Sequence, residues 1–243
     1  MNWRIFHKSE TDSTNRDARA GRPGDVFTAD YQTAGRGRLD HRWLSRPGAN
    51  LMMSAVVGVE GLDPAHVATL PLVAGLSVVE AVASLLGDAS PPAALKWPND
   101  VLVGGRKIAG ILCERNGDAV VVGIGVNVGE REFPSEIAAR ATSFAALVRR
   151  APTVAAVRDA VLARLAENAV RWRAEGFAAL LPRIASVDCL KGREVSVLRT
   201  DADGAPARGL CGGIADDGSL LVASERVYAG EAHVIAATDL FKV

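Results

Sequence analysis

The sequence predicts a mixed α/β fold of the α+β type, with a larger domain at residues 1–185 and a small β-barrel at residues 186–243. Three observations support this prediction. Strand-like segments follow one another between residues 95 and 128, which is typical of an antiparallel meander rather than of alternating β-α-β units. Segments of helical periodicity precede and follow the meander. From about Ser186 onward only short strand-like segments separated by turns occur, and they fit a small barrel that packs against the larger domain.

The first half of the larger domain begins with two predicted strands, residues 26–32 and 51–59. A helix is predicted from Asp63, a suitable N-cap, with Pro64 at its first position, and its apolar positions continue to Gly87. Pro71 is expected to kink or restart this helix, because proline removes a backbone hydrogen bond.

The second half contains four predicted strands and a long helix. The strands are residues 95–97, 101–103, 106–114 and 119–128, separated by glycine-containing turns. Thr153 is placed to cap a helix whose apolar positions share one face and which ends at Gly176. The barrel strands are predicted at residues 194–199, 209–215, 220–223 and 233–236, with turns at 201–204 and 216–218.

The composition is that of a globular protein, and we expect a cytoplasmic one. Of the 243 residues, 49% are apolar and 23% charged, and 28 basic residues balance 28 acidic ones. The net charge of 0 gives no general attraction to nucleic acid or anionic membrane, so neither is expected as a partner. The apolar stretch 67–86 contains proline, glycine and glutamate, which argues against a membrane helix. Three cysteines lack disulfide or metal-ligand spacing and are expected to be reduced: Cys113, Cys189 and Cys211.

Two short segments carry the clearest chemistry. One is Gly35-Arg36-Gly37-Arg38, and the other is Lys96-Trp97-Pro98-Asn99-Asp100, closely followed by residues 105–111. Glycines let the backbone approach a ligand, and fixed cations neutralise phosphate. Activating a carboxylate with ATP brings two anions into contact, so these segments favour a site that holds phosphate against carboxylate. For the first segment alone, a solvated basic turn is the competing interpretation.

Together with other motifs, these segments resemble those of biotin protein ligases of the short, monofunctional kind. The matching segments keep the family's order and approximate spacing: residues 13–15, 32–38, 43, 96–100, 107–112 and 123–127. The resemblance implies a mixed sheet with flanking helices, related to the catalytic fold of class II aminoacyl-tRNA synthetases, and an SH3-like barrel after it. Longer members carry a DNA-binding module before the serine-threonine motif, and only 12 residues precede Ser13, so repressor activity is not expected.

The activity implied by the resemblance is that of a biotin–[acetyl-CoA-carboxylase] ligase. Such an enzyme makes biotinyl-5′-adenylate and pyrophosphate from biotin and ATP, then transfers biotin to one lysine of a carboxylase's biotin carboxyl carrier domain. Mg²⁺ is expected to arrive with ATP, held by its phosphates. No protein metal site is predicted, because the four histidines are dispersed. A monomer and a homodimer both remain possible.

The resemblance also implies roles for individual residues. The residues expected to bind biotin are Ser13, Thr14, Gln32, Gly35, Arg36, Arg38, Lys107 and Gly110. Those expected to bind ATP or the adenylate are Arg38, Arg42, Trp43, Lys96, Asn99 and Asn127. Lys96 and Arg38 are expected to stabilise charge on the α-phosphate, and Asp100 to hold Lys96 or the loop or to help deprotonate the incoming amine.

Structural interpretations compete with several of these roles. Ser13 suits an ordinary helix cap, Trp43 a core aromatic, and Asn127 a turn at the end of a strand. Lys107 lies in a predicted strand, where a lysine usually faces solvent. The family loop commonly has glycine and arginine where this chain has Asp40 and His41, which suggests that adenylate retention depends on pH through His41.

Three other functions fit part of the pattern. Lipoate and octanoate ligases share the fold, and the tryptophan-proline-asparagine-aspartate segment favours biotin over them. A degenerate, non-catalytic module would bind biotin or nucleotide without turnover, but Lys96, Arg38 and Lys107 are all present. The barrel as a nucleic-acid or peptide adaptor is disfavoured, because its basic residues are interspersed with acidic ones.

Overall fold

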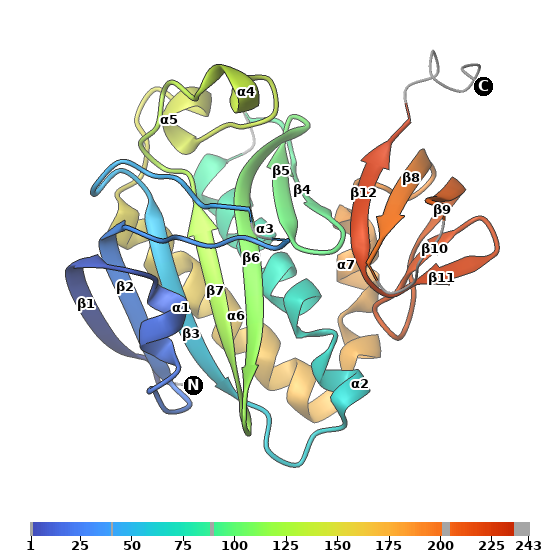
Figure 1. The fold of residues 1–243 in the computed structure, drawn as a ribbon, viewed down its shortest axis with the longest axis horizontal. Coiled ribbons are helices and arrows are strands. Elements are labelled where there is room, and N and C mark those ends of the chain that lie inside the picture. Colours follow the sequence, from blue (N-terminus) through green and yellow to red (C-terminus); the bar gives the residue numbers. More distant parts are fainter. Residues whose placement is uncertain (1, 40, 88–89, 201–204, 236–243) are drawn as a thin grey trace.

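The computed structural model describes residues 2–39, 41–87, 90–200 and 205–235. A seven-stranded mixed sheet forms the larger part of the molecule (Figure 1). In spatial order its strands are β1 (Arg4–Thr11), β2 (Asp25–Gln32), β3 (Leu51–Gly58), β7 (Ala119–Val126), β6 (Arg106–Asn116), β5 (Asp100–Val103) and β4 (Ala93–Lys96). Strand β1 is parallel to β2, and every other neighbouring pair of this sheet is antiparallel.

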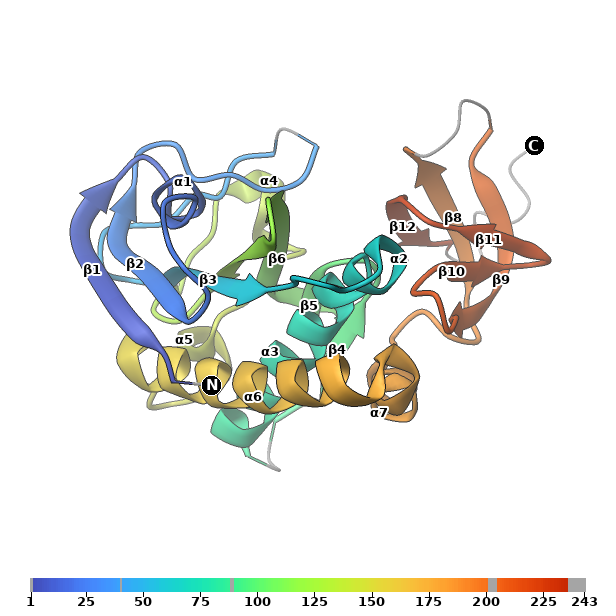
Figure 2. The same cartoon turned by 90° about the horizontal axis from the view of Figure 1, so that it is seen from below.

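Two long helices cover one face of this sheet, α3 (Leu70–Leu86) and α6 (Val154–Glu175), while α1 (Thr14–Ala18) lies on the opposite face (Figure 2). The long helix α3 is buried on most sides, because it packs between the sheet, α6 and α7. The shorter helical segments are α2 (Pro64–Val67), α4 (Ser135–Ala138), α5 (Phe144–Leu147), the 3₁₀ turn η1 (Phe177–Ala179) and α7 (Leu181–Val187).

The stretch Pro64–Leu86 is long and apolar enough to cross a membrane by length and composition. Within the structure, however, 72% of its most apolar window is buried, as in the core helix of a soluble protein. Leu70, Val73 and Leu76 are fully or almost fully enclosed among the strands and helices of the main core. This burial accounts for its hydrophobicity without a membrane.

The signals for helix ends are confirmed. The Asp63 carboxylate accepts a hydrogen bond from the Ala65 amide at the start of α2. The helical conformation is interrupted between α2 and α3, and α3 restarts at Leu70 with Pro71 in its first turn, as predicted. Thr153 caps α6 through the Ala156 amide, and Gly176 ends it in a left-handed conformation. Each of these signals involves residues close together in the sequence, so the helix ends can be predicted without knowledge of the tertiary structure.

The antiparallel meander is also confirmed, with strand ends shifted by a few residues. The predicted segment 95–97 is β4 (Ala93–Lys96), and Trp97 instead begins the turn to β5, where the Trp97–Pro98 peptide is cis. The predicted strand 119–128 ends at Val126. Strand β1 was not predicted: seven of its eight residues are exposed and one is half-buried, so no alternation of apolar and polar residues marks it.

The C-terminal part is a small antiparallel sheet rather than a demonstrated closed barrel. Its order is β11 (Glu225–Val227), β10 (Leu220–Val222), β9 (Ala207–Ile214), β8 (Glu194–Arg199) and β12 (Gly230–Val234). Among the described residues β11 and β12 are its edges and do not pair with each other. The predicted strand 233–236 is therefore β12, which begins earlier, and β11 was missed. Residue 236 and the predicted turn 201–204 lie outside the described residues. The predicted domain boundary at 185/186 falls within α7 and stays a prediction.

Candidate active site

A pocket opens on the α1 face of the large sheet. Its floor is formed by β6 and β7, its roof by the arginine loop (residues 33–43, with residue 40 outside the described part), and one wall by β12 of the C-terminal sheet. Most predicted site residues line it: Ser13, Thr14, Gln32, Arg36, Arg38, Arg42, Trp43, Lys96, Asn99, Asp100, Lys107 and Gly110. The segments from four separate parts of the sequence are thus brought together as predicted.

Gly35 and Asn127 are not part of that lining. Gly35 lies in an adjoining groove on the outer side of the arginine loop, where its carbonyl accepts a hydrogen bond from the Trp43 amide. The Asn127 side chain is buried and donates to the Thr142 carbonyl at 3.0 Å. This contact supports the structural interpretation of Asn127, as a residue that fixes the chain leaving β7.

One end of the pocket is neutral and polar. The Thr14 amide and hydroxyl both donate to Gln32 Oε1, at 2.7 and 3.1 Å. Ser54, which lies in the otherwise apolar β3, is fully buried and places its hydroxyl 2.8 Å from the Thr14 hydroxyl. Sequence reasoning missed Ser54, although a lone serine within an apolar strand is a usable signal. This end can hold a ligand with several uncharged donors and acceptors.

Ser13 occupies the N-cap position of α1 but does not cap it. Its backbone is extended, and its hydroxyl makes no hydrogen bond to the first amides of the helix. The side chain is buried, with 5% of the residue exposed, and it lines the pocket. The hydroxyl is therefore placed to contact a ligand rather than the helix.

The other end of the pocket is cationic. The Lys107 ammonium lies 2.6 Å from Asp100 Oδ1, so Asp100 pairs with Lys107. The predicted alternative in which Asp100 holds Lys96 is not found. Lys96 is the last residue of β4, and no ion pair joins its ammonium to another of the residues that the structure describes. Its charge therefore remains available to a ligand anion.

Arg38 joins the two parts of the molecule at this end. One guanidinium nitrogen lies 3.3 Å from both Asn99 Oδ1 and the Gly230 carbonyl of β12. Burial lowers the pKa of Arg38, while the negative charges of Asp100 and Glu231 act in the opposite direction. An arginine so placed stays protonated, because its ordinary pKa is far above neutrality.

Trp43 lies against glycines of the sheet. A Cβ on Gly125 would lie 2.6 Å from Trp43 Cε2, and one on Gly110 would lie 3.4 Å from Trp43 Cζ3. Only glycine at residue 125 therefore leaves room for the indole in this position. The indole N–H is buried and has no hydrogen-bond partner among the described residues. An unpaired buried donor at this place fits a ligand that supplies an acceptor.

Arg36 and Arg42 have protein partners. Arg36 forms an ion pair with Glu114 of β6 at 3.0 Å, and Arg42 donates to the Thr33 carbonyl at 3.1 Å. Among the described residues, no group of three or more His, Cys, Asp or Glu side chains is arranged to hold a metal ion.

Comparison with known proteins places this geometry in a family. Residues 7–129 match the model of the biotin/lipoate A/B protein ligase family. A biotin–[acetyl-CoA-carboxylase] ligase of Paracoccus denitrificans is 35% identical over 250 aligned positions, covering 96% of this chain and 98% of that protein. The ligase of the same name from Mycobacterium tuberculosis is 40% identical over 173 residues, which make up 68% of this chain but only 64% of the relative.

A solved structure agrees over nearly the whole chain. The biotin protein ligase of Aquifex aeolicus, in complex with biotin and ATP, superposes with a TM-score of 0.85 at 31% identity. That match covers 95% of this chain and 99% of the Aquifex chain, so it includes the C-terminal sheet. The family model, the nearly full-length relative and the shared fold agree, and the chain belongs to the biotin/lipoate A/B protein ligase family.

Proposed function

We propose that the protein is an ATP-dependent biotin protein ligase. It forms biotinyl-5′-AMP and pyrophosphate from biotin and ATP, and then transfers biotin to a specific lysine of a biotin carboxyl carrier domain. The observation that carries this proposal is one pocket with a neutral polar end, around Thr14 and Gln32, and a cationic end, around Lys96 and Lys107. A ureido ring fits the first end and a carboxylate beside phosphate fits the second.

In the first step the biotin carboxylate attacks the α-phosphorus of ATP, and pyrophosphate leaves. No general base is needed, because a carboxylic acid is already ionised at neutral pH. Lys107 steers the carboxylate, and Lys96 and Arg38 stabilise the negative charge that builds on the α-phosphate. Mg²⁺ arrives with ATP and reduces repulsion between its phosphates, which are its main ligands.

In the second step the carrier lysine attacks the acyl carbon of the adenylate, and AMP leaves. The attacking amine must lose a proton, and Asp100 is the carboxylate nearest to the cationic end of the pocket. Trp43 and the arginine loop shield the mixed anhydride from water between the two steps. The Trp43 indole N–H donates to the ligand and so gains the partner that it lacks among the residues that the structure describes.

Several finer features belong to the same proposal. The C-terminal sheet belongs to an SH3-like domain, residues 1–185 form the catalytic domain, and the protein acts in the cytoplasm as a monomer or homodimer. Its partner is the carrier domain of a biotin-dependent carboxylase, and it does not bind nucleic acid. The family relationship and the balanced charge support this assignment.

Lipoate or octanoate ligation is the second candidate, because the matching family model covers both kinds of ligase. The polar end of the pocket disfavours it. An aliphatic chain or dithiolane ring offers no hydrogen-bond partners to Ser13, Thr14 and Gln32, whose polar groups line this end of the pocket.

ATP-dependent pyrophosphate release tests the proposal, with biotin, lipoate or octanoate as the only acid and a biotin carrier domain as acceptor. We expect release with biotin alone and label on one carrier lysine. Release with lipoate or octanoate would assign the protein to the sister activity. Tight biotin binding without release would make it a non-catalytic binding module.

A further inference from the structure

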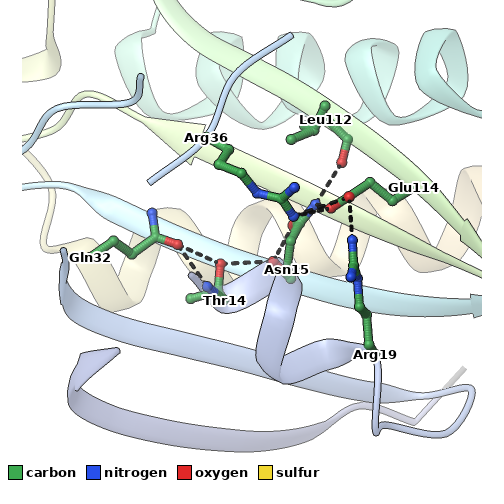
Figure 3. A network of polar contacts seen from close by, with 8 residues as sticks. Thr14, Asn15, Arg19, Gln32, Arg36, Leu112 and Glu114 are labelled. Carbon is green, nitrogen blue, oxygen red and sulfur yellow. Dashed lines mark hydrogen bonds and ion pairs between the residues drawn. The ribbon is translucent and has the colours of Figure 1, made fainter. Parts of the chain in front are cut away.

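A carboxylate on β6 ties the arginine loop to the sheet. Glu114 receives hydrogen bonds from Arg36 at 3.0 and 3.1 Å, from Arg19 at 2.9 Å and from Asn15 Nδ2 at 2.6 Å (Figure 3). We call these four residues the Glu114 cluster. Arg36 comes from the arginine loop, whereas Asn15 lies in α1 and Arg19 directly follows α1. Only one of the partners of Glu114 therefore belongs to the loop that covers the pocket.

The Glu114 cluster continues into the polar end of the pocket. Asn15 Oδ1 lies 2.6 Å from the Ser54 hydroxyl, which in turn lies 2.8 Å from the hydroxyl of Thr14. The position of Asn15 also depends on the sheet, because a Cβ on Gly123 would lie only 2.1 Å from Asn15 Oδ1. The carboxylate of Glu114 is thus held on the sheet side, and the loop arginine is the component that can leave.

The charges explain why this contact persists at neutral pH. Burial raises the pKa of Glu114, but hydrogen bonds from Asn15 and Arg19 and the positive charge of Arg36 outweigh it, so the pKa lies below its ordinary value. Arg36 consequently has its charge compensated within the protein. Lys96 and Arg38 therefore remain as the phosphate-binding cations, whereas Arg36 links the arginine loop to Glu114.

The rest of the loop depends on where Arg36 lies. Arg36 and Arg42 pair as an isolated antiparallel bridge, and the Gly37 amide donates to the His41 carbonyl at 2.6 Å. This hairpin carries Arg38, and Trp43 follows it directly. Fixing Arg36 on the sheet therefore fixes the two groups that cover the reacting end of the pocket.

We infer that Glu114 is a positioning residue that holds the arginine loop closed over the acyl-adenylate through its ion pair with Arg36. This inference rests on the proposed ligase function. Without the ion pair the loop opens more often, and the adenylate leaves the pocket before a carrier lysine reaches it. Affinity for biotin itself is unchanged, because the ureido contacts lie at Thr14 and Gln32.

Glu114→Gln tests the inference, because glutamine keeps the size of the side chain and an acceptor for Asn15 but loses the charge. We expect the bound adenylate to dissociate about three- to tenfold faster, as for the loss of one partly exposed charged hydrogen bond. The biotin KM should stay within about twofold of wild type. Arg36→Gln should also speed dissociation of the adenylate, and the double variant should lose the adenylate no faster than the faster single variant.

Arg19→Gln is the matched control, since it removes an ion pair from the same carboxylate without touching the loop. Equal acceleration in Arg19→Gln and Glu114→Gln would overturn the inference and leave Glu114 with a structural role alone. Full additivity of Glu114→Gln and Arg36→Gln would also overturn it.

A second readout separates this inference from the proposed function. Trypsin cleaves after the loop arginines, so its rate on ligand-free protein reports loop opening without any catalysis. We expect faster loop cleavage in Glu114→Gln than in Arg19→Gln. If the wild-type protein forms no adenylate but Glu114→Gln is still cleaved faster than Arg19→Gln, the ligase proposal is refuted and the loop contact is kept. Equal cleavage of the two variants would refute the loop contact.

Discussion

At the scale of single residues, the basic side chains of the pocket differ by what each one contacts. Arg36 is paired with Glu114 and Lys107 with Asp100, whereas Lys96 has no ion-pair partner among the described residues. Arg38 is held by an amide oxygen and a carbonyl, which direct its guanidinium without cancelling its charge. The sequence does not show these neighbours, which separate the two cations paired with a carboxylate from the two whose charge stays uncompensated.

Lys96→Met should abolish most adenylation while leaving biotin bound. Removing one positioned charge donor typically lowers kcat by about 100- to 1,000-fold. The measurement is single-turnover pyrophosphate release, with the biotin Kd determined separately. Lys8→Met is the control, because Lys8 lies on the exposed strand β1 and forms its ion pair with Asp17 of α1. This variant should release pyrophosphate at the wild-type rate. A Lys96→Met rate within tenfold of wild type would remove Lys96 from the chemistry.

Cys113 should resist alkylation in the folded protein. Burial, with a smaller contribution from the charge of Glu114, raises the pKa of the Cys113 thiol to about 12. At pH 8 its thiolate is therefore about a thousandfold scarcer than that of a free cysteine. Labelling with iodoacetamide followed by peptide mass mapping should find Cys113 modified only after unfolding in urea. Labelling of the native protein at the rate of a free thiol would contradict the raised pKa of this half-buried side chain.

The sign of the linked stability effect follows from the same shift. The folded state holds the Cys113 proton more tightly than the unfolded chain does. Its contribution is fully present below the ordinary thiol pKa and is lost as the pH rises toward about 12.

At the scale of elements, local signals and tertiary demands separate clearly. The caps at Asp63 and Thr153 and the break before Pro71 are set by neighbouring residues, so they are predictable. Strand β1 is held by parallel pairing to β2, and its own residues are mostly exposed, so the sequence offers no pattern for it. Gly110 and Gly125 can be recognised from the sequence as parts of motifs. Why glycine is needed there becomes clear only from the structure, in which the Trp43 ring lies against both residues.

Ser13→Ala and Thr153→Ala should behave differently although both residues occupy N-cap positions. Thr153 accepts a hydrogen bond from the Ala156 amide, so its loss should lower the free energy of unfolding by about 1 kcal/mol and leave activity unchanged. Ser13 makes no cap hydrogen bond, so its loss should raise the biotin Kd about five- to tenfold with little effect on stability. Urea denaturation and biotin titration measure both. The reverse pattern would restore Ser13 as an ordinary cap.

At the scale of the whole molecule, the C-terminal sheet forms part of the pocket. Gly230, Glu231 and Ala232 of β12 line it, and Arg38 bonds the Gly230 carbonyl across 192 residues of sequence. A second link joins the Trp97 indole N–H to the Gly218 carbonyl at 3.0 Å. The sequence predicts a small barrel that packs against the larger domain, but it does not show which residues meet, because contacts between residues so far apart leave no local pattern.

Trp97→Phe and Trp3→Phe form a matched pair that tests this coupling. Each tryptophan donates its indole N–H to a backbone carbonyl, of Gly218 in one case and of Leu162 in the other. Each substitution should lower the free energy of unfolding by about 1 to 2 kcal/mol. Only Trp97→Phe should also raise the KM for ATP severalfold, since only it removes a hydrogen bond between a pocket residue and the C-terminal sheet. Equal ATP KM values would show that the C-terminal sheet is dispensable for nucleotide binding.

The position of β12 also affects the protein while it is being made. Chains are synthesised from the N-terminus, and early segments fold before late ones emerge. The large sheet with Lys96 and the arginine loop is complete long before residues 230–234 have been added. Until then the pocket lacks one wall, and Arg38 lacks the carbonyl that directs it. Under the proposed ligase function, a chain still on the ribosome would therefore hold no finished pocket for a reactive acyl-adenylate until β12 has been added.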